Sequence, residues 1–311
     1  MRMAEILSFG EPLAEFNQTQ AGSAAWRLGY GGDTSNFCIA AARQGASVDY
    51  ISATGDDRFG QGLRDLWQAE GVGHSHVRTD PQAPTGVYFV SHDASGHHFD
   101  YLRAGSAASR YVPAYLPGQA IASARALHLS GISLAISQDA CDAGLEAMAQ
   151  ARAAGVMVSF DTNLRLRLWP LARARAVMRE ALRLCDLCLP SWDDITAVLD
   201  CHEPDAILDT LLDCGIELVA LKMGARGCYV ATPESRILVP PHAVDAVDAT
   251  GAGDCFGGAF VARLVAGDDA VAAARYANVA AALSTTGYGA IASIPRAEAV
   301  YGALGTYACA S

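Results

Sequence analysis

Short apolar segments alternate with longer amphipathic segments along most of this 311-residue chain, and this alternation limits its fold more than any other feature. A short continuous apolar run is typical of a strand that is buried on both faces. Such strands, joined by helices, form a parallel sheet with helices on both sides. We therefore expect a doubly wound α/β fold whose strands end at one edge, where ligands bind.

The predicted strands and helices follow each other in regular order. Strands are expected at 6–9, 48–53, 126–130, 156–161, 187–190, 218–223 and 228–231. Helices are expected between them, for example at 34–44, 60–70, 138–154, 171–184 and 205–214. A last glycine-rich turn leads into an apolar helix that is expected to end near Ala266, with Gly267 as its cap.

Two segments interrupt this order, at about 15–30 and 85–103. In both, polar and apolar residues alternate and turn residues are frequent. The runs 87–91 and 97–103 flank a turn at 93–96 and predict a hairpin. We place these strands in a small sheet outside the main one, as a lid on a single domain that covers 1–311.

The composition excludes several function classes. A net charge of −11 gives the protein no general electrostatic attraction to nucleic acid or to an anionic membrane. No run reaches membrane-spanning length, and the first ten residues lack the apolar core of a signal peptide. The nine cysteines include one close pair, Cys185 and Cys188, with no second pair to complete a zinc site. These features predict reduced core cysteines and a cytoplasmic protein.

The run Val-Asp-Ala-Thr-Gly-Ala-Gly-Asp at 247–254 places small residues before a helix. The first N–H groups of a helix lack partners and attract anions, and glycine lets an anion approach closely. Gly251, Ala252 and Gly253 are therefore a candidate phosphate cradle, and Asp254 a candidate catalytic group at its mouth. The helix N-terminus should favour the charged form of Asp254 and make it a weak base. The alternative is an ordinary loop with Asp254 as the helix cap.

The longer run Asp-x-Thr-Gly-Ala-Gly-Asp-x-Phe-Gly-Gly, at 248–258, resembles the second signature of the ribokinase-like sugar kinases, also called the phosphofructokinase-B family. No Gly-Lys-Ser/Thr follows the glycines, so the run is not a Walker loop. The resemblance implies a ribokinase-like fold, with a mainly parallel sheet flanked by helices and a small β-sheet lid. It also implies transfer of a phosphoryl group from ATP to a sugar hydroxyl.

A second glycine cluster, at 29–36, resembles the first signature of the same family. The resemblance implies that Gly32, Asp33 and Asn36 contact the sugar hydroxyls. The alternative is a tight turn in which Thr34 or Ser35 caps a helix. The Gly-x-Asp-x-x-Gly stretch at 55–60 continues the resemblance and is interpreted as mainly structural.

Four further stretches resemble the 2-keto-3-deoxygluconate kinases within this family. They are Gly10-Glu11-Pro12-Leu13, the run 101–108, the run 128–132 and Asp161-x-Asn163-x-Arg165. The resemblance implies substrate contacts by Tyr88, Tyr101, Arg103 and Arg165. A carboxylate can be held by guanidinium groups through paired hydrogen bonds, whereas a neutral hexose needs no arginine pair. A surface ion pair for Arg165 and a cross-strand pair for Arg103 are the alternatives.

The nucleotide side is inferred from the same resemblance. Lys222 and the turn from Gly224 to Gly227 would border the ATP phosphates, and Asn278 the adenine; Lys222 otherwise extends to solvent. Ser191 and Asp194 stand where the family has an asparagine and a glutamate tied to Mg²⁺ and phosphate, and the shorter Asp194 leaves direct coordination of Mg²⁺ open. Asp248 lies where related kinases often hold a monovalent cation such as K⁺, and the sequence leaves open whether one binds.

The favoured function is an ATP-dependent kinase acting on the terminal hydroxyl of a keto sugar acid, 2-keto-3-deoxygluconate first. The alternatives are a fructokinase or another sugar kinase of this fold, and a nucleotide-binding regulatory module without catalysis. A Rossmann oxidoreductase is disfavoured because the first strand lacks G-x-G-x-x-G. The family often presents an acidic residue near Gly287, which this chain lacks, so Tyr288 or a backbone group would replace it. The small lid predicts a homodimer.

Overall fold

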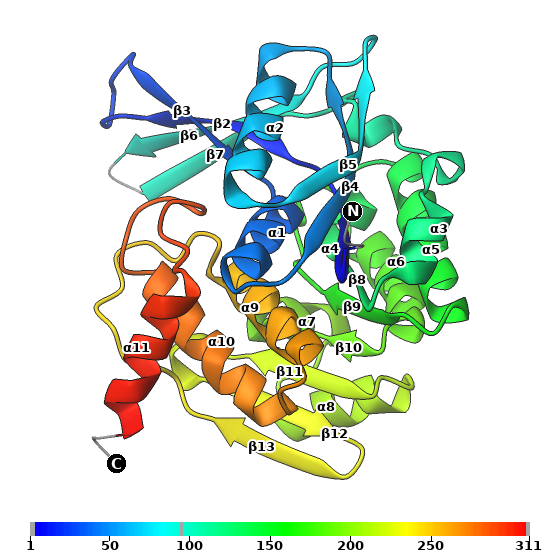
Figure 1. Cartoon of the computed structure of the whole chain (residues 1–311), viewed down its shortest axis with the longest axis vertical. Helices are drawn as coiled ribbons and strands as arrows, with labels where there is room; N and C mark the ends of the chain where they lie inside the picture. Colours follow the sequence, from blue (N-terminus) through cyan, green and yellow to red (C-terminus); the bar gives the residue numbers. More distant parts are fainter. Residues whose placement is uncertain (1–3, 94–95, 309–311) are drawn as a thin grey trace.

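A nine-stranded sheet forms the centre of the computed structural model, which describes residues 4–93 and 96–308 (Figure 1). Seven adjacent strands are parallel, and β12 and β13 are added antiparallel at one edge. In spatial order the strands are β13 (Ser235–Val239), β12 (Cys228–Thr232), β11 (Leu218–Lys222), β10 (Leu187–Cys188), β9 (Met157–Asp161), β8 (Ala126–Ser130), β1 (Ile6–Phe9), β4 (Val48–Gly55) and β5 (Gly73–Asp80). The doubly wound parallel sheet expected from the sequence is confirmed.

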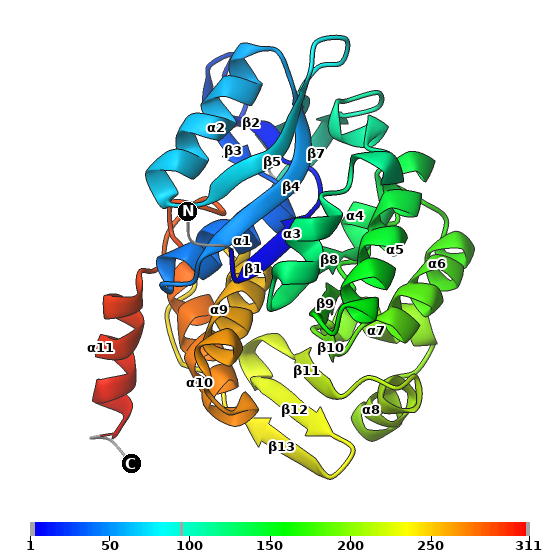
Figure 2. The same cartoon turned by 45° about the vertical axis from the view of Figure 1, so that its right-hand side comes forward.

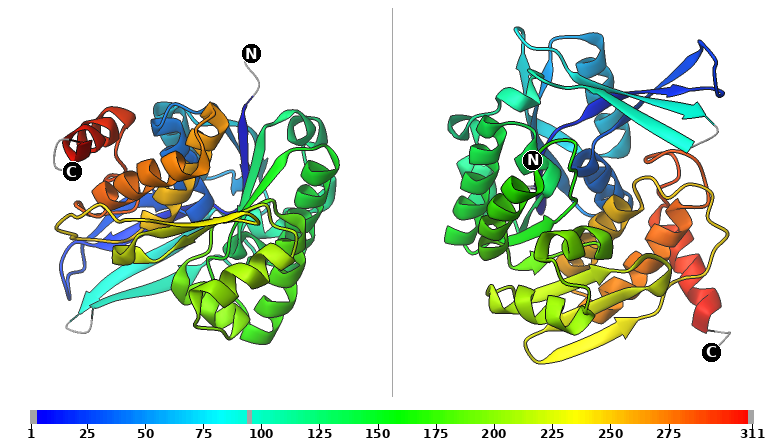
Figure 3. Two further views of the ribbon diagram at one scale, coloured as in Figure 1. Left: turned by 90° about the horizontal axis from the view of Figure 1, so that it is seen from below. Right: turned by 180° about the vertical axis from the view of Figure 1, so that it is seen from behind.

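Helices cover both faces of this sheet, as the view along its edge shows (Figure 3). One face carries α3 (Gly118–Ser123), α4 (Gly131–Ala135), α5 (Gln138–Ala153), α6 (Leu171–Leu184), α7 (Trp192–Leu199) and α8 (Pro204–Asp213). The other carries α1 (Asp33–Arg43), α2 (Arg58–Glu70), α9 (Ala252–Ala266), α10 (Ala270–Ser284) and α11 (Ala297–Ala308). A hydrophobic core lies on each face of the sheet. Strand β1 contributes to both, because Leu7 and Phe9 belong to the core on the first face and Ile6 to the core on the second. None of the helices in the described part of the chain is both long and apolar enough to cross a membrane.

The interrupting segments form a separate four-stranded sheet that projects from the main body (Figure 1), and part of it lies behind α2 in the view of Figure 2. Its order is β3 (Trp26–Gly31), β2 (Leu13–Gln18), β6 (Gly86–Asp93) and β7 (Gly96–Leu102). The β6–β7 hairpin is confirmed, although residues 94–95 of its predicted turn lie outside the described residues. The small sheet expected beside the main one is therefore present; we call it the lid.

The sequence did not predict β5 and β13. Both are edge strands, and β5, which reads Gly-His-Ser-His-Val-Arg-Thr-Asp, has no apolar run because much of it faces solvent. Strand β10 has two residues instead of the expected four. The described cysteines are free thiols, and Cys185 and Cys188 are buried as expected.

The amino ends of α1 and α9 differ from the alternatives considered for them. Helix α1 begins at Asp33 after Gly32, so neither Thr34 nor Ser35 is a cap. Instead, the Thr34 hydroxyl lies 2.8 Å from the Tyr50 hydroxyl, and Ser35 accepts a hydrogen bond from the Trp67 indole. Helix α9 begins at Ala252 with Gly251 as its cap, so Asp254 lies inside the first turn, and α9 ends at Gly267 as expected.

Helices α1 and α9 pack with almost no space between their backbones. A Cβ atom on Gly258 would lie 2.5 Å from the carbonyl oxygen of Phe37, which is closer than real Cβ contacts. The close approach places the first turns of the two helices beside each other at the carboxyl edge of the sheet. Asn36 of α1 can therefore donate a hydrogen bond to Asp254 of α9 over 2.8 Å.

Replacement of Gly258 by valine should destabilise the protein, because the added atoms have to push α1 away from α9. Overpacking of this kind typically lowers the free energy of unfolding by about 1–3 kcal/mol. Gly302→Ala is the matched control, since Gly302 lies in α11 with nothing within 4 Å of an added Cβ. That change should be neutral or stabilising by up to about 1 kcal/mol. Equal urea midpoints for Gly258→Val and wild type would contradict the packing argument.

Candidate active site

A cavity of about 600 Å³ lies between the carboxyl edge of the large sheet and the lid. Most of the side chains predicted for the substrate and for catalysis line it, although they come from segments far apart in the sequence. The predicted residues on its wall are Gly32, Asp33, Asn36, Tyr88, Tyr101, Arg103, Arg165, Ser191, Asp194, Lys222, Gly251, Gly253 and Asp254. The structure therefore brings together the two glycine clusters and the arginines.

The glycine turn before α9 opens onto this cavity. Gly251 has φ +76°, and a Cβ there would meet Ala290 at 3.0 Å, so a side chain is disfavoured on both counts. Gly253 faces outward, and only the Lys222 ammonium lies near its missing Cβ, at 3.5 Å. The Ala252 N–H is bonded to the carbonyl of Ala249. Among the described residues, the N–H groups of Gly251, Gly253 and Asp254 have no hydrogen-bond partner, so these three can receive an anion.

The carboxyl group of Asp254 stands beside these N–H groups. Burial and, after it, the negative charge of Asp33 raise the pKa of Asp254 to about 8, against the hydrogen bond from Asn36. The expectation that the helix N-terminus would keep Asp254 a weak base is therefore wrong. Loss of water and repulsion by a neighbouring carboxylate outweigh the helix dipole. A base with a pKa near neutrality suits proton transfer at physiological pH.

Asp33 and Asn36 leave hydrogen-bond acceptors open. Asp33 Oδ2 accepts from Ser130 and from Asn163, the latter over 3.1 Å. Asp33 Oδ1 and Asn36 Oδ1 are buried without a partner in the described structure. Buried acceptors normally have donors, so these two atoms fit ligand hydroxyl groups. Gly32 permits the turn, because its φ of +107° and the Glu11 carbonyl 2.4 Å from a Cβ leave no room for a side chain.

The lid contributes rings and one guanidinium. Tyr88 is buried, donates its hydroxyl to Glu15 and stacks on Tyr101 with ring centres 5.8 Å apart. The guanidinium carbon of Arg103 lies 5.8 Å from the ring centre of Tyr101, which is two residues earlier in the same segment, so this contact is not the cross-strand pair considered as the alternative. Arg103 also forms an ion pair with the buried carboxylate of Glu11. Its charge is thus already partly neutralised, which the sequence did not predict.

Two more cations face the cavity from the central strands. The Lys222 ammonium forms an ion pair with Asp161, and only 12% of its side chain is exposed, so it does not extend to solvent. Burial raises the pKa of Asp161, and Lys222 partly opposes this. Arg165 is different, because 52% of its side chain is exposed and the Asp194 carboxylate lies 3.9 Å away. This contact is the surface ion pair considered as the alternative for Arg165, but it is long, and the exposed half of the side chain can still receive an anion.

The structure does not bring three residues predicted for the nucleotide to the cavity. Gly224 is exposed beyond β11, and Gly227 lies beneath the carbonyl of Val239. Asn278 donates to the carbonyl oxygen of Pro240 over 2.9 Å, which fixes the chain after β13. Ala252 also has no surface on the cavity wall. These residues lie in adjoining turns and helices.

The two carboxylates predicted to bind metal ions already accept hydrogen bonds from protein groups. Asp194 Oδ2 accepts from the Ser191 hydroxyl over 2.7 Å, and its Oδ1, which has no hydrogen bond within the described residues, lies 3.9 Å from the Arg165 guanidinium. Asp248 accepts from the N–H groups of Thr250 and Gly289, each over 2.9 Å. No group of three or more metal-ligating side chains occurs in the described part of the chain. Mg²⁺ commonly takes one or two carboxylates and otherwise waters and phosphates, so Asp194 fits an ATP-bound Mg²⁺.

Sequence reasoning missed several lining residues. Glu11, Asp161 and Asn163 were quoted in motifs without a role, and Arg167 was not singled out; all four line the cavity. Their position at the carboxyl ends of β1 and β9, or in the loops that follow these strands, is the signal that could have found them. Tyr288 is 76% exposed and has no surface on the cavity, where Ala290 stands instead. Tyr288 is therefore not the replacement for the missing acidic group in this structure.

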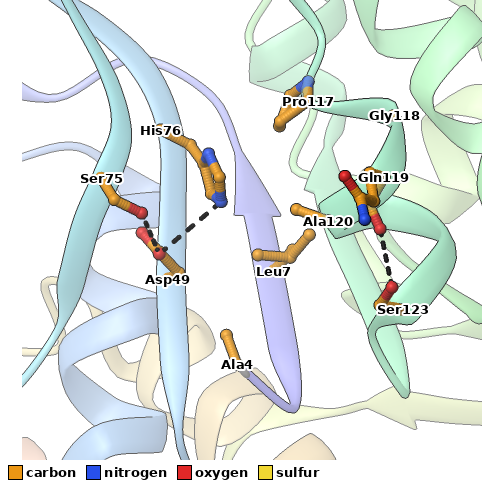
Figure 4. A pocket seen from close by; sticks show the side chains of 10 residues that line it. All are labelled: Ala4, Leu7, Asp49, Ser75, His76, Pro117, Gly118, Gln119, Ala120 and Ser123. Carbon is orange, nitrogen blue, oxygen red and sulfur yellow. Dashed lines mark hydrogen bonds and ion pairs between the residues drawn. The ribbon is translucent and has the colours of Figure 1, made fainter. Parts of the chain in front are cut away.

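A second cavity, of about 530 Å³, lies near the amino ends of β1 and β4, away from these residues (Figure 4). Ser75 donates to Asp49 over 2.8 Å there, and His76 lies 3.9 Å from the same carboxylate. Facing them are Gln119 and Ser123 of α3. Parallel α/β sheets bind ligands at the carboxyl ends of their strands, so the cavity beneath the lid is the candidate active site.

Comparison with known proteins agrees with this geometry. The model of the pfkB family carbohydrate kinases matches residues 3–297. The 2-dehydro-3-deoxygluconokinase of Thermoproteus tenax is 35% identical over 90% of this chain and 88% of its own. The Probable fructokinase-7 of Arabidopsis thaliana is 32% identical over 95% and 91%. A solved E. coli protein designated Ribokinase II, in complex with ATP and Mg²⁺, superposes with a TM-score of 0.91 at 26% identity, covering 98% of this chain and 100% of that one.

The raised pKa of Asp254 predicts that this residue reduces stability at neutral pH. An unfolded aspartate has a pKa near 4, so between about pH 4 and 8 unfolding releases a proton and stability falls as pH rises. Asp254→Asn should therefore stabilise the protein, by more at pH 8 than at pH 5. Because Asp254 is only partly buried, we count only a tenfold change in proton affinity, worth about 1.4 kcal/mol.

Urea unfolding at both pH values measures this difference. Asp193→Asn is the control, because Asp193 is exposed at the start of α7 and its loss should not give a pH-dependent gain. A stability difference for Asp254→Asn that is zero, or that shrinks toward pH 8, would contradict the electrostatic account.

Proposed function

Because the chain belongs to the pfkB family of carbohydrate kinases, we propose that it transfers the γ-phosphoryl group of ATP to the terminal hydroxyl of a keto sugar acid, 2-keto-3-deoxygluconate first. The family membership makes it a phosphotransferase that acts on a sugar hydroxyl. The observation that supports an acid substrate is the open guanidinium of Arg165 in the same cavity as Asp254 and Arg103. A neutral sugar has no charge that would require it.

In the proposed mechanism Asp254 orients the hydroxyl and accepts its proton as the new O–P bond forms and the bond to the leaving ADP breaks. The N–H groups of Gly251, Gly253 and Asp254 receive the negative charge of the phosphoryl oxygens. Asp33 and Asn36 offer acceptors to the other hydroxyls, while Tyr88 and Tyr101 cover the sugar. Asp254→Asn should lower kcat roughly 10²–10⁴-fold, the usual contribution of a positioned acid–base group.

The proposed nucleotide side comprises Ser191, Lys222, the 224–227 turn and Asn278. When bound, Mg²⁺ would neutralise phosphate charge, and Asp194 would hold it through Oδ1. A K⁺ site at Asp248 remains part of the proposal; its carboxylate already accepts two N–H groups, so backbone carbonyls would have to supply the ligands. A cytoplasmic location is likewise proposed.

A fructokinase is the second candidate, and one observation favours it. The segment 286–290 has no acidic residue, whereas the keto-acid kinases that the chain resembles often present one there. Fructokinases of plants are also similar to the whole chain. A module without catalysis is disfavoured, because Asp254 and its open N–H groups are both in place.

The substrate is tested by measuring ADP release with keto-acids, aldonates and neutral hexoses. Wild type should prefer 2-keto-3-deoxygluconate, and Arg165→Ala should lose about 10–100-fold in kcat/KM for it, because a charge-assisted hydrogen bond is worth about 1.5–3 kcal/mol. Arg165→Lys should recover only part, since the planar fork is lost. The KM for ATP should stay within about twofold. Faster turnover of fructose than of any keto-acid would overturn this assignment.

A homodimer formed through the lid is also proposed. Trp26 and Leu28 of β3 and Leu102 of β7 are exposed apolar side chains on this small sheet, which has only a minor core of its own. A second copy that covers them would stabilise the lid. Sedimentation at micromolar protein should give a mass near twice 32.5 kDa. Leu28→Asp should shift it toward monomer, whereas a monomeric wild type with and without substrate would argue against the dimer.

A further inference from the structure

Arg167 lies two residues beyond Arg165 in the loop that follows β9, and both guanidinium groups line the active-site cavity. The loop leaves the strand through Asn163, whose φ of +30° is uncommon for a residue with a side chain. Asn163 is held there by its amide, which donates to Asp33, and by its own N–H, which donates to Asp161 over 3.3 Å. Asp33 and Asp161, which both line the cavity, therefore fix the start of the loop that carries both arginines.

The charges in the cavity are not equally available to a ligand. Arg103 is paired with the buried carboxylate of Glu11, and Lys222 with that of Asp161. Arg165 has its nearest carboxylate oxygen at 3.9 Å. Arg167 makes no ion pair with the described residues, and its contact is a hydrogen bond from Nη1 to the backbone oxygen of Phe99. A guanidinium has five N–H donors, so Arg167 keeps most of them for an anion.

The contact with Phe99 joins this loop to the lid. Phe99 lies on β7, the edge strand that also carries Tyr101, and its ring lines the same cavity. Because β7 pairs only with β6, carbonyl groups on its free edge are open to a donor from the main body. Arg167 is thus part of the loop after β9, donates a hydrogen bond to the lid and lines the cavity.

We propose that Arg167 determines specificity, by supplying the second guanidinium for the substrate carboxylate and by holding β7 over the bound acid through Phe99. This inference rests on the proposed function and refines its substrate site. Arg103 then serves mainly to anchor the lid on Glu11, and the two open arginines of the β9 loop form the anion clamp. A carboxylate gripped by Arg165 and Arg167 would be sealed by the strand that carries Phe99 and Tyr101.

The test compares a keto-acid with a neutral ketose in the same variants. Arg167→Met should lose about 10–100-fold in kcat/KM for 2-keto-3-deoxygluconate, mainly through KM, and less than about threefold for fructose. Dissociation constants from calorimetry provide the same ratio if fructose is turned over too slowly. Arg167→Lys should recover part of the loss. Arg173→Met, on the exposed face of α6, is the control and should match wild type.

A second measurement reports the lid directly. Binding of the keto-acid should slow amide hydrogen exchange in residues 96–102 of wild type and should not do so in Arg167→Met. Equal losses for acid and ketose, or no loss at all, would overturn the role of Arg167 while leaving the proposed function intact. A wild type that turns over no keto-acid would refute the proposed function, and this inference with it.

Discussion

The close contact between α1 and α9 is the constraint on which the active site depends. At Gly258 the backbones approach so closely that a single Cβ would collide with the carbonyl of Phe37. Because both helices begin at the carboxyl edge of the sheet, this contact sets the two glycine clusters side by side. The hydrogen bond between Asn36 and Asp254 then joins residues that are 218 positions apart. The groups proposed for sugar binding and those proposed for phosphoryl transfer are thereby held together by one packed helix pair.

The carboxylates gathered beside these two helices lower the stability of the protein, because they are buried close to one another. Asp33, Asp161 and Asp254 are gathered at one sheet edge, and burial and mutual repulsion raise the pKa values of Asp161 and Asp254. Lys222 offsets part of the repulsion at Asp161. Burial and, after it, repulsion by Asp33 raise the pKa of Asp254 to about 8, which suits the proposed role of this carboxylate in taking a proton from an alcohol. Functional sites commonly retain such destabilising arrangements.

The lid contributes a different kind of group. It supplies the faces of Tyr88 and Tyr101, and its one inward guanidinium is tied to Glu11 at the end of β1. The β9 loop supplies Arg165, whose ion pair with Asp194 is long, at 3.9 Å, and Arg167, which donates to the lid backbone at Phe99. In the proposed function, recognition of an anionic group and covering of the cavity are therefore connected through a single short loop.

Much of this architecture follows from the sequence alone. The apolar runs determine the parallel strands because a strand buried on both faces needs apolar residues throughout, and Gly251 and Gly267 mark the ends of α9 because both adopt positive φ. The sequence did not predict edge strands such as β5, because a strand that faces solvent does not need a continuous run of apolar residues. The direction of the pKa shift of Asp254 was also predicted wrongly. The helix dipole can be inferred from local sequence, whereas the burial of Asp254 and the approach of Asp33 arise only in the folded chain. Likewise, residue type marks Arg103, Arg165 and Arg167 as cations. Only tertiary packing decides that Arg103 pairs closely with the buried Glu11, whereas Arg165 keeps a carboxylate no nearer than 3.9 Å, because carboxylates distant in sequence are placed by the fold.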